Sequence, residues 1–241
     1  DQLLFWRVFQ LPFTYSTPRQ AMELAASAAE TIPAFSEELD KFGVTFLFQQ
    51  PVGAYFLTGP DAACDTVAGK KVRSFGSDVP KAHEAIGAVP VTISVGDIYE
   101  GLERGSLDYS FINRGNVLSN RLYEPAKYSC GPIMAIAGHL IVINSDKWAD
   151  ISEADQAIML EEAKIASGEY IDNIEKAEEA AGADITADGG EIKAFPASEL
   201  ALWKEKAPNF LQNWVDDMES RGLGEGAEAA AALIRAETGG N

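Results

Sequence analysis

The chain has 241 residues, of which 46% are hydrophobic and 23% charged, an ordinary balance for a globular protein. Its formal net charge of −18 argues against a nucleic-acid partner, because phosphates need compensating lysine and arginine. The sequence shows no signal peptide and no apolar run of the roughly 20 residues that cross a bilayer. Its two cysteines, Cys64 and Cys130, lack zinc-type spacing, so no metal site is expected.

The first half of the chain is predicted to alternate helices with strands. Thr17 can cap a helix that begins at Pro18, with Gln20 at the position that a capping box requires. A second helix is expected at 35–42, and the β-branched and aromatic residues 44–50 predict a strand. Further elements follow in chain order: strands at 54–57, 71–75, 89–94 and 107–112, and helices at 80–86 and 96–104.

The second half contains one long helix among shorter elements. After a strand at 140–144, Ser152 marks the start of a helix whose apolar residues Ile158, Ile165 and Ile174 share one face. The remaining elements are a strand at 191–194, a helix from Ser198 that Pro208 should end, and a last helix at 226–237. The alternation predicts an α/β protein, and any two lobes would be joined by short strand-like hinges.

Residues 69–128 carry the most informative series of motifs. They read GKKVRSFG, then GAVPVTISVGDIYEGLERGSLDYSFIN, then RLYEPAKY. In order and spacing this series resembles the DctP-type solute-binding proteins of TRAP transporters. Their pattern is a Gly-Leu-Lys-Ile-Arg strand, then Gly-Ala-x-Pro, then Glu-Val-Tyr-x-Ala-Leu-x-x-Gly-x-Val-Asp-Gly. The similarity covers nearly the whole chain, from the Leu-Pro-Phe at 11–13 through IVINSDKWADISEADQAIMLEEA at 141–163 to the C-terminal helices.

The resemblance implies a two-lobed periplasmic binding protein fold of the α/β class, with a long helix bridging the lobes. Lobe I is expected at 1–53 plus 138–178, and lobe II at 54–137 plus 179–241. Members of the family open with a strand–helix–strand section that supplies a central strand of the first lobe. This sequence begins after that section, so the N-terminal section is expected to be missing, with a differently built first lobe as the alternative.

The family's ligand-binding arginine aligns with Arg73, which the resemblance therefore makes the clamp for a carboxylate. A guanidinium is planar, permanently charged and able to bind a carboxylate through two hydrogen bonds. The alternative is an ordinary arginine that pairs with one of the chain's 37 acidic residues. The stretch 107–113 aligns with the family's Val-Asp-Gly-Gln-Glu-Asn-Pro, whose last residues form the pocket wall. The corresponding residues here are Ser110, Phe111, Ile112 and Asn113.

Phe111 and Ile112 are apolar where the family is polar, which predicts a less hydroxylated, aromatic or aliphatic acid as ligand. As the alternative, both are core residues of a strand. Tyr55 is expected as an additional donor, and Val95 aligns with an aromatic wall residue of the family. His139 is expected at the edge of the cleft, although a lone histidine is more often structural.

The function implied by the resemblance is capture of a small organic acid between closing lobes and its delivery to a membrane permease, without a cofactor. Such a protein is not an enzyme, is expected to be a monomer, and works in the periplasm. In that compartment Cys64 could pair with Cys130, with two reduced thiols as the alternative. No G-x-S-x-G, P-loop or H-E-x-x-H motif is present. The competing functions are a two-lobed α/β enzyme and a ligand sensor.

Overall fold

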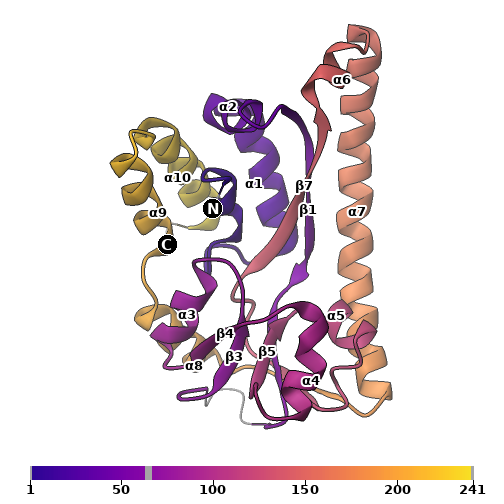
Figure 1. Cartoon of the computed structure of the whole chain (residues 1–241), viewed down its shortest axis with the longest axis vertical. Coiled ribbons are helices and arrows are strands. Elements are labelled where there is room, and N and C mark those ends of the chain that lie inside the picture. Colours follow the sequence, from indigo (N-terminus) through magenta and orange to yellow (C-terminus); the bar gives the residue numbers. More distant parts are fainter. Residues whose placement is uncertain (1, 63–66, 240–241) are drawn as a thin grey trace. The chain divides into compact units, whose positions relative to one another are not determined.

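The computed structural model describes residues 2–62 and 67–239 and divides the chain into two compact units (Figure 1). Unit 1 comprises Asp1–Val52, Ile136–Ile174 and Leu211–Asn241, and unit 2 comprises Gly53–Ala135 and Glu175–Phe210. Both units mix helices with strands, which confirms the predicted α/β class. None of the helices in the described residues is long and apolar enough to cross a membrane.

Unit 1 contains a two-stranded sheet, β1 with β7, surrounded by helices. Its elements in chain order are η1 (Trp6–Gln10), α1 (Pro18–Thr31), α2 (Pro33–Asp40), β1 (Val44–Ala54), β7 (Ile136–Asn144), α6 (Ser145–Ala149), α7 (Glu153–Ala187), α9 (Phe210–Ser220) and α10 (Gly224–Thr238). Most of α7 belongs to unit 1, and its last turns from Glu175 onward belong to unit 2. The single long helix that the sequence predicts is therefore present and contributes to both units.

Aromatic rings form the core of unit 1. Phe35 of α2 lies at the centre, with its ring centroid 5.4 Å from Phe5, 5.2 Å from Trp6 and 5.6 Å from Phe9. All four side chains are buried. Aromatic pairs at these separations add to the free energy of burial, so the N-terminal segment is held against α2.

Residues 211–241 differ from the expected lobe assignment, because the structure groups them with unit 1. Trp214 of α9 is buried and donates its indole N–H to the Leu4 carbonyl at 2.8 Å. Helix α10 packs closely as well, since a Cβ at Gly226 would lie 2.7 Å from the Cβ of Ala34. The apolar faces of these two helices thus find their partners in the N-terminal segment and α2.

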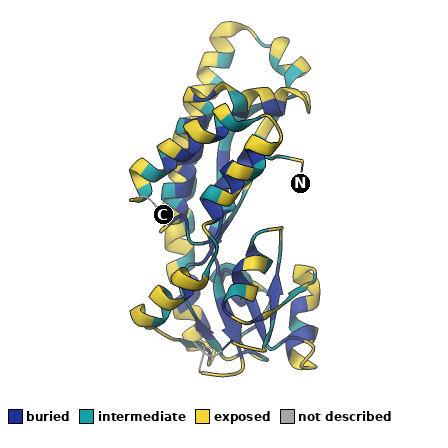
Figure 2. Cartoon of the chain, turned by 90° about the vertical axis from the view of Figure 1, so that its left-hand side faces the viewer, coloured by how far each residue is buried: buried dark blue, intermediate teal, exposed yellow. Residues whose placement is uncertain are grey.

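Unit 2 is built on a mixed six-stranded sheet with the order β4-β3-β5-β2-β6-β8. Its strands are β2 (Phe56–Gly59), β3 (Lys71–Ser74), β4 (Val89–Thr92), β5 (Tyr109–Ile112), β6 (Tyr128–Cys130) and β8 (Glu191–Ile192). Its helices are α3 (Val79–Ala85), η2 (Val95–Asp97), α4 (Ile98–Glu103), α5 (Arg114–Ser119) and α8 (Ala197–Lys206). The central strands of this sheet are dark blue in Figure 2, and all four residues of β5 are buried.

The register of this sheet fixes which side chains are neighbours. Strand β3 runs parallel to both β4 and β5, with Arg73 level with Ser110. Strand β2 runs antiparallel to β5 and β6, and pairs Thr58 with both Ser110 and Ser129. Because residues paired across strands face the same side of a sheet, Arg73, Ser110, Thr58 and Ser129 form one row across four strands.

Candidate functional site

Parallel strands present their carboxyl ends at one sheet edge, which is where open α/β sheets bind ligands. In unit 2 this edge is formed by the ends of β3 and β5 and by the residue that precedes β2. Four side chains meet there, and we refer to them as the Arg73 cluster: Tyr55, Arg73, Phe75 and Phe111. Three of the four were expected at the site from the sequence.

Arg73 is the only cation of the cluster, and its side chain is 6% exposed. Its Nη1 donates to the Phe111 carbonyl at 3.1 Å, and its guanidinium also hydrogen-bonds the Tyr55 side chain. Its Nε is buried and has no hydrogen-bond partner in the part of the chain that the structure describes. Burial lowers the pKa of Arg73 from its ordinary value, although an arginine remains protonated in proteins.

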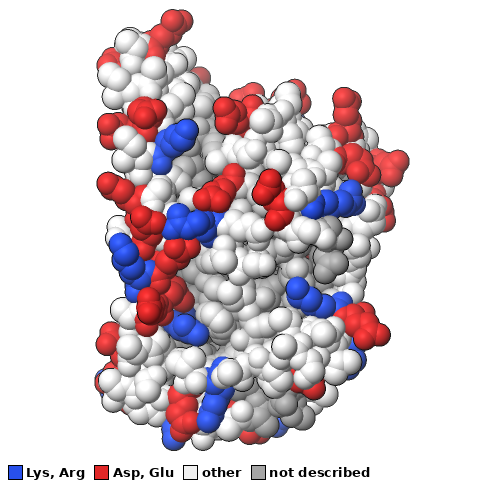
Figure 3. All heavy atoms as spheres, turned by 180° about the vertical axis from the view of Figure 1, so that it is seen from behind, with Lys and Arg blue, Asp and Glu red and all other residues white. Residues whose placement is uncertain are grey.

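No carboxylate forms an ion pair with Arg73 among residues 2–62 and 67–239. This is unusual in a chain with 37 acidic and 19 basic residues. On the face shown in Figure 3, acidic side chains are spread widely and basic ones lie between them. Arg104 illustrates the common arrangement, since it is exposed and pairs with Glu100 at 3.0 Å. The buried guanidinium of Arg73 instead keeps an unopposed positive charge.

Phe75 lies beside this guanidinium, and its ring packs with those of Tyr55 and Phe111. The Phe75 ring centroid lies 5.2 Å from Arg73 Cζ, 5.0 Å from the Tyr55 ring and 6.1 Å from the Phe111 ring, to which it is nearly parallel. Tyr55 and Phe111 are buried, whereas Phe75 remains partly exposed. Burial raises the pKa of Tyr55, so its hydroxyl keeps its proton at neutral pH and can act as a donor. The cluster therefore combines one cation with an accessible aromatic ring.

His83 of α3 packs directly behind the cluster. Its ring meets the Phe111 ring edge-on, with centroids 5.2 Å apart. The imidazole is fully buried, and neither nitrogen has a hydrogen-bond partner in the described ranges. Burial, followed by the positive charge of Arg73, lowers the pKa of His83 to about 4. The ring is consequently neutral at physiological pH and adds no second charge beside Arg73.

The polar row of the sheet is buried beside Arg73. Thr58 and Ser129 bond each other through their hydroxyls at 3.1 Å. Ser110 is fully buried between Arg73 and Thr58, and its Oγ has no partner in the described chain. Ile112 is also fully buried. Phe111 and Ile112 are both buried inside unit 2, which agrees with the alternative that these two strand residues form part of the core.

A second arginine at this edge is differently placed. Arg114 opens α5, and its Cζ lies 4.6 Å above the Phe56 ring. Glu178 of α7 accepts hydrogen bonds from the backbone N–H groups of Arg114 at 3.0 Å and Gly115 at 2.9 Å. Burial raises the pKa of Glu178, while these two bonds and the charge of Arg114 act in the opposite direction. The Glu178 carboxylate thus lies near Arg114, held by the backbone of α5.

Two features fix the local backbone around Glu178. Gly53 adopts φ +100°, and a Cβ there would lie 3.0 Å from the Glu178 carboxylate, so only glycine fits without displacement. Asn113 caps α5 by accepting a hydrogen bond from the Asn116 N–H at 3.2 Å. The amide oxygen of Asn113, which was expected as a site residue, is therefore engaged by the N-terminus of α5.

The remaining predicted site residues lie outside the Arg73 cluster. Val95 begins η2, shortly after the end of β4, and is 37% exposed. His139 is an exposed residue of β7 and belongs to unit 1. Cys130 is disulfide-bonded, and Cys64 lies outside the described residues.

Sequence reasoning missed Phe75, His83 and Glu178. Phe75 follows Arg73 by two residues, so its proximity to the arginine was a usable signal. His83 had no motif around it. Glu178 is 64 residues from its partner Arg114 and lies on a helix rich in acidic residues. Only the folded chain distinguishes it from its exposed neighbours.

The family model of bacterial extracellular solute-binding proteins, family 7 (DctP), matches residues 5–217. Over 233 residues the chain is 26% identical to the C4-dicarboxylate-binding periplasmic protein DctP of Rhodobacter capsulatus, covering 95% of this chain and 67% of that protein. It is 22% identical to the ectoine-binding periplasmic protein TeaA of Halomonas elongata, covering 88% of this chain and 63% of that protein. The chain thus spans only 63–67% of the length of these curated relatives.

A solved structure shares the fold. A TRAP solute-binding protein of Rhodoferax ferrireducens T118, in complex with copurified benzoate, superposes with a TM-score of 0.83 at 22% sequence identity. The similarity covers 99% of this chain and 76% of that one. The two-lobed periplasmic binding protein architecture expected from the sequence is therefore confirmed.

Proposed function

This chain belongs to the bacterial extracellular solute-binding proteins, family 7 (DctP), the solute-binding proteins of TRAP transporters, and we propose that its ligand is a small organic acid held by Arg73. It would bind the acid in the periplasm as a monomer and deliver it to a membrane permease. The relatives support this ligand class: one is named for C4-dicarboxylates, and another was solved with benzoate.

The main support for the proposal is that Arg73 is buried without an ion-pair partner among the described residues. Burying a charged group is costly unless a partner of opposite charge offsets the loss of hydration. Arg73 is buried, has a free Nε in the described chain and faces no carboxylate there. A ligand carboxylate supplies the missing negative charge and can accept charge-assisted hydrogen bonds from the guanidinium.

Other side chains of the cluster would assist this anchor. The Phe111 carbonyl accepts a hydrogen bond from Arg73 and so fixes the orientation of the guanidinium. Tyr55 would donate a second hydrogen bond to the ligand. Ser110, Ile112 and Asn113 would act from within unit 2, by shaping the end of β5. A contact from Val95 is proposed only on the alignment with the family, and one from His139 only on its expected place at the edge of the cleft.

A thermal-shift screen against small mono- and dicarboxylates tests the proposal, because a ligand that binds the folded state raises the melting temperature. Arg73→Ala should weaken the binding of every hit more than tenfold, since a charge-assisted hydrogen bond contributes about 1.5–3 kcal/mol. Arg104→Ala is the matched control, because it removes an exposed arginine of the same unit. It should leave affinity unchanged.

Three outcomes would contradict the proposal. A well-folded protein that no carboxylate stabilises is not an organic-acid binder. Equal affinity of wild type and Arg73→Ala would remove Arg73 from the site. If chromatography of the ligand showed that the protein converts the bound acid into another compound, the enzyme alternative would be favoured.

A further inference from the structure

The balance of charges around the Arg73 cluster indicates how many carboxylate groups its ligand carries. Arg73 forms no ion pair with a carboxylate among the described residues, whereas Glu178 at the same edge accepts hydrogen bonds from the backbone N–H groups of Arg114 and Gly115. Each arginine carries one positive charge, and Glu178, which bonds the backbone at Arg114 and also acts on Tyr55, carries one negative charge. The edge therefore has a net charge of one positive unit, which matches a ligand with a single carboxylate.

The surface next to this charge is aromatic. Phe75 is partly exposed, and the rings of Tyr55 and Phe111 lie 5.0 Å and 6.1 Å from it. A planar ring on the ligand could lie against Phe75 while its carboxylate reaches Arg73, since the guanidinium is 5.2 Å from the Phe75 ring. Aromatic rings pair at centroid separations of 4.5–7 Å.

Among the residues of unit 2 that the structure describes, few polar side chains next to the Arg73 cluster are accessible to ligand hydroxyls. Asn113 is engaged in capping α5, and Ser94 donates its hydroxyl to Asp97 at 2.6 Å. The hydroxyls of Ser74 and Ser110 have no partner in the described chain, but both side chains are 0% exposed, so a ligand does not reach them. A ligand with several hydroxyl groups would leave them without partners over the Phe75 ring, and an unpaired polar group costs free energy on desolvation.

Taking the proposed function as its basis, we infer that the ligand is an aromatic monocarboxylate with few hydroxyl groups. Its carboxylate binds Arg73, and its ring packs on Phe75. The Tyr55 hydroxyl is the one further donor of the cluster. The inference deepens the organic-acid proposal by selecting one class among aromatic, aliphatic, polyhydroxylated and dicarboxylic acids.

Calorimetric titration of the whole chain with four probes tests this class: benzoate, hexanoate, gluconate and succinate. Benzoate should bind at least tenfold more tightly than each of the other three. Phe75→Ala should weaken benzoate binding about two- to twelvefold, the usual range for the loss of one aromatic contact. Phe75→Leu keeps an apolar side chain without a ring and should weaken benzoate binding by a smaller factor.

Phe195→Ala is the control, because Phe195 is a partly exposed phenylalanine of unit 2 that packs on Trp203 instead. It should leave benzoate affinity unchanged. Tighter binding of gluconate, succinate or hexanoate than of benzoate would overturn the inference and leave the organic-acid function intact. Equal benzoate affinity in wild type and Phe75→Ala would overturn it as well. Failure of all four acids to bind would instead contradict the proposed function.

Discussion

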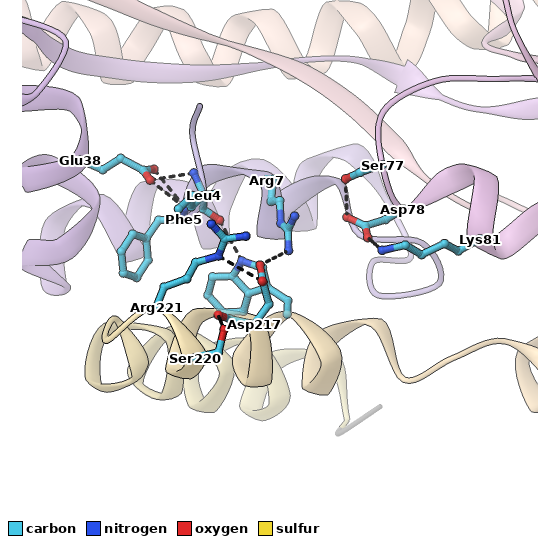
Figure 4. A network of polar contacts seen from close by, with 11 residues as sticks. Leu4, Phe5, Arg7, Glu38, Ser77, Asp78, Lys81, Asp217, Ser220 and Arg221 are labelled. Atoms are coloured by element: carbon cyan, nitrogen blue, oxygen red, sulfur yellow. Dashed lines mark hydrogen bonds and ion pairs between the residues drawn. The ribbon is translucent and has the colours of Figure 1, made fainter. Parts of the chain in front are cut away.

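In unit 1 the buried carboxylate of Glu38 accepts hydrogen bonds from the backbone N–H groups of Leu4 and Phe5 (Figure 4). In unit 2, by contrast, the buried guanidinium of Arg73 forms no ion pair with a carboxylate among the described residues. Arg7 of unit 1 likewise pairs with Asp217 at 3.1 Å. Buried side-chain atoms without a partner in the described chain are found in unit 2 on Arg73, Ser74, His83, Ser110 and Arg114, which lie around one sheet edge. Unit 1 has such an atom at Gln49 Oε1.

This difference separates two reasons for burying a polar group. A buried group whose hydrogen bonds are complete holds the fold together, and its removal leaves its partners unsatisfied. A buried group with open positions costs stability in the free protein, and such groups gather at functional sites. Unit 1 shows the first pattern at Glu38, and unit 2 shows the second around Arg73.

Removing Glu38 should give the largest change in stability. Glu38→Ala leaves the N–H groups of Leu4 and Phe5 without an acceptor, and each unsatisfied buried donor costs about 1–3 kcal/mol. We expect the free energy of unfolding in urea to fall by roughly 2–5 kcal/mol. Glu37→Ala is the control, because Glu37 is the exposed neighbour on the same helix. Equal losses in both variants would show that the carboxylate of Glu38 does not hold the N-terminal segment.

The sequence predicted the elements of both units where the periodic pattern is long. The start of α1 at Pro18 after the cap Thr17 is confirmed, as is the break at Pro208, since α8 ends at Lys206 and α9 begins at Phe210. Strand β6 and helix α5 were missed, because elements of three and six residues are too short to show a period.

The site was predictable only where a motif marks it. Arg73 was found through its aligned strand, and the structure then showed that it is buried without an opposing carboxylate. His83 and Glu178 could not be found in this way. Their roles depend on contacts with β5 and with the N-terminus of α5, which come from other parts of the sequence. Burial of a polar group is a property of the folded chain.

The two histidines, buried His83 of unit 2 and exposed His139 of unit 1, should differ in how they make stability depend on pH. His83 of unit 2 has a pKa of about 4, against about 6.5 in an unfolded chain. Between these values the unfolded state binds the extra proton, so stability falls as the pH drops from about 6.5 to about 4. The loss amounts to about 3 kcal/mol at most and is complete below pH 4. Urea unfolding at several pH values measures it.

His83→Leu should remove this dependence, and the difference between wild type and variant isolates His83 from the carboxylates that titrate in the same range. Glu38 and Glu178, whose pKa values are raised by burial, act in the opposite direction in both proteins. His139→Leu is the control, since His139 is exposed in unit 1. If wild type and His83→Leu lose stability in parallel, the buried imidazole is not the group that titrates.

The smallest expected change in stability concerns the first residues of two helices, α1 and α3. In unit 1 the Thr17 hydroxyl accepts a hydrogen bond from the Gln20 N–H at 3.1 Å, and the Gln20 side chain accepts one from the Ser16 N–H at 2.9 Å. In unit 2, Asp78 precedes α3 without capping it, and its carboxylate instead binds Ser77 and Lys81 (Figure 4).

Thr17→Ala should therefore lower the free energy of unfolding by about 1 kcal/mol, the usual cost of losing an N-cap. Asp78→Ala should change it by less than about 0.5 kcal/mol, because an exposed pair of this kind contributes little. Thr17→Ser keeps the hydroxyl and should restore most of the loss. A larger effect at Asp78 than at Thr17 would mean that α3 depends on the Asp78 carboxylate for its start. The hydrogen bonds of Asp78 would then stabilise α3, as the cap hydrogen bond of Thr17 stabilises α1 in unit 1. The contrast between the two units would in that case be limited to Arg73 and its immediate neighbours.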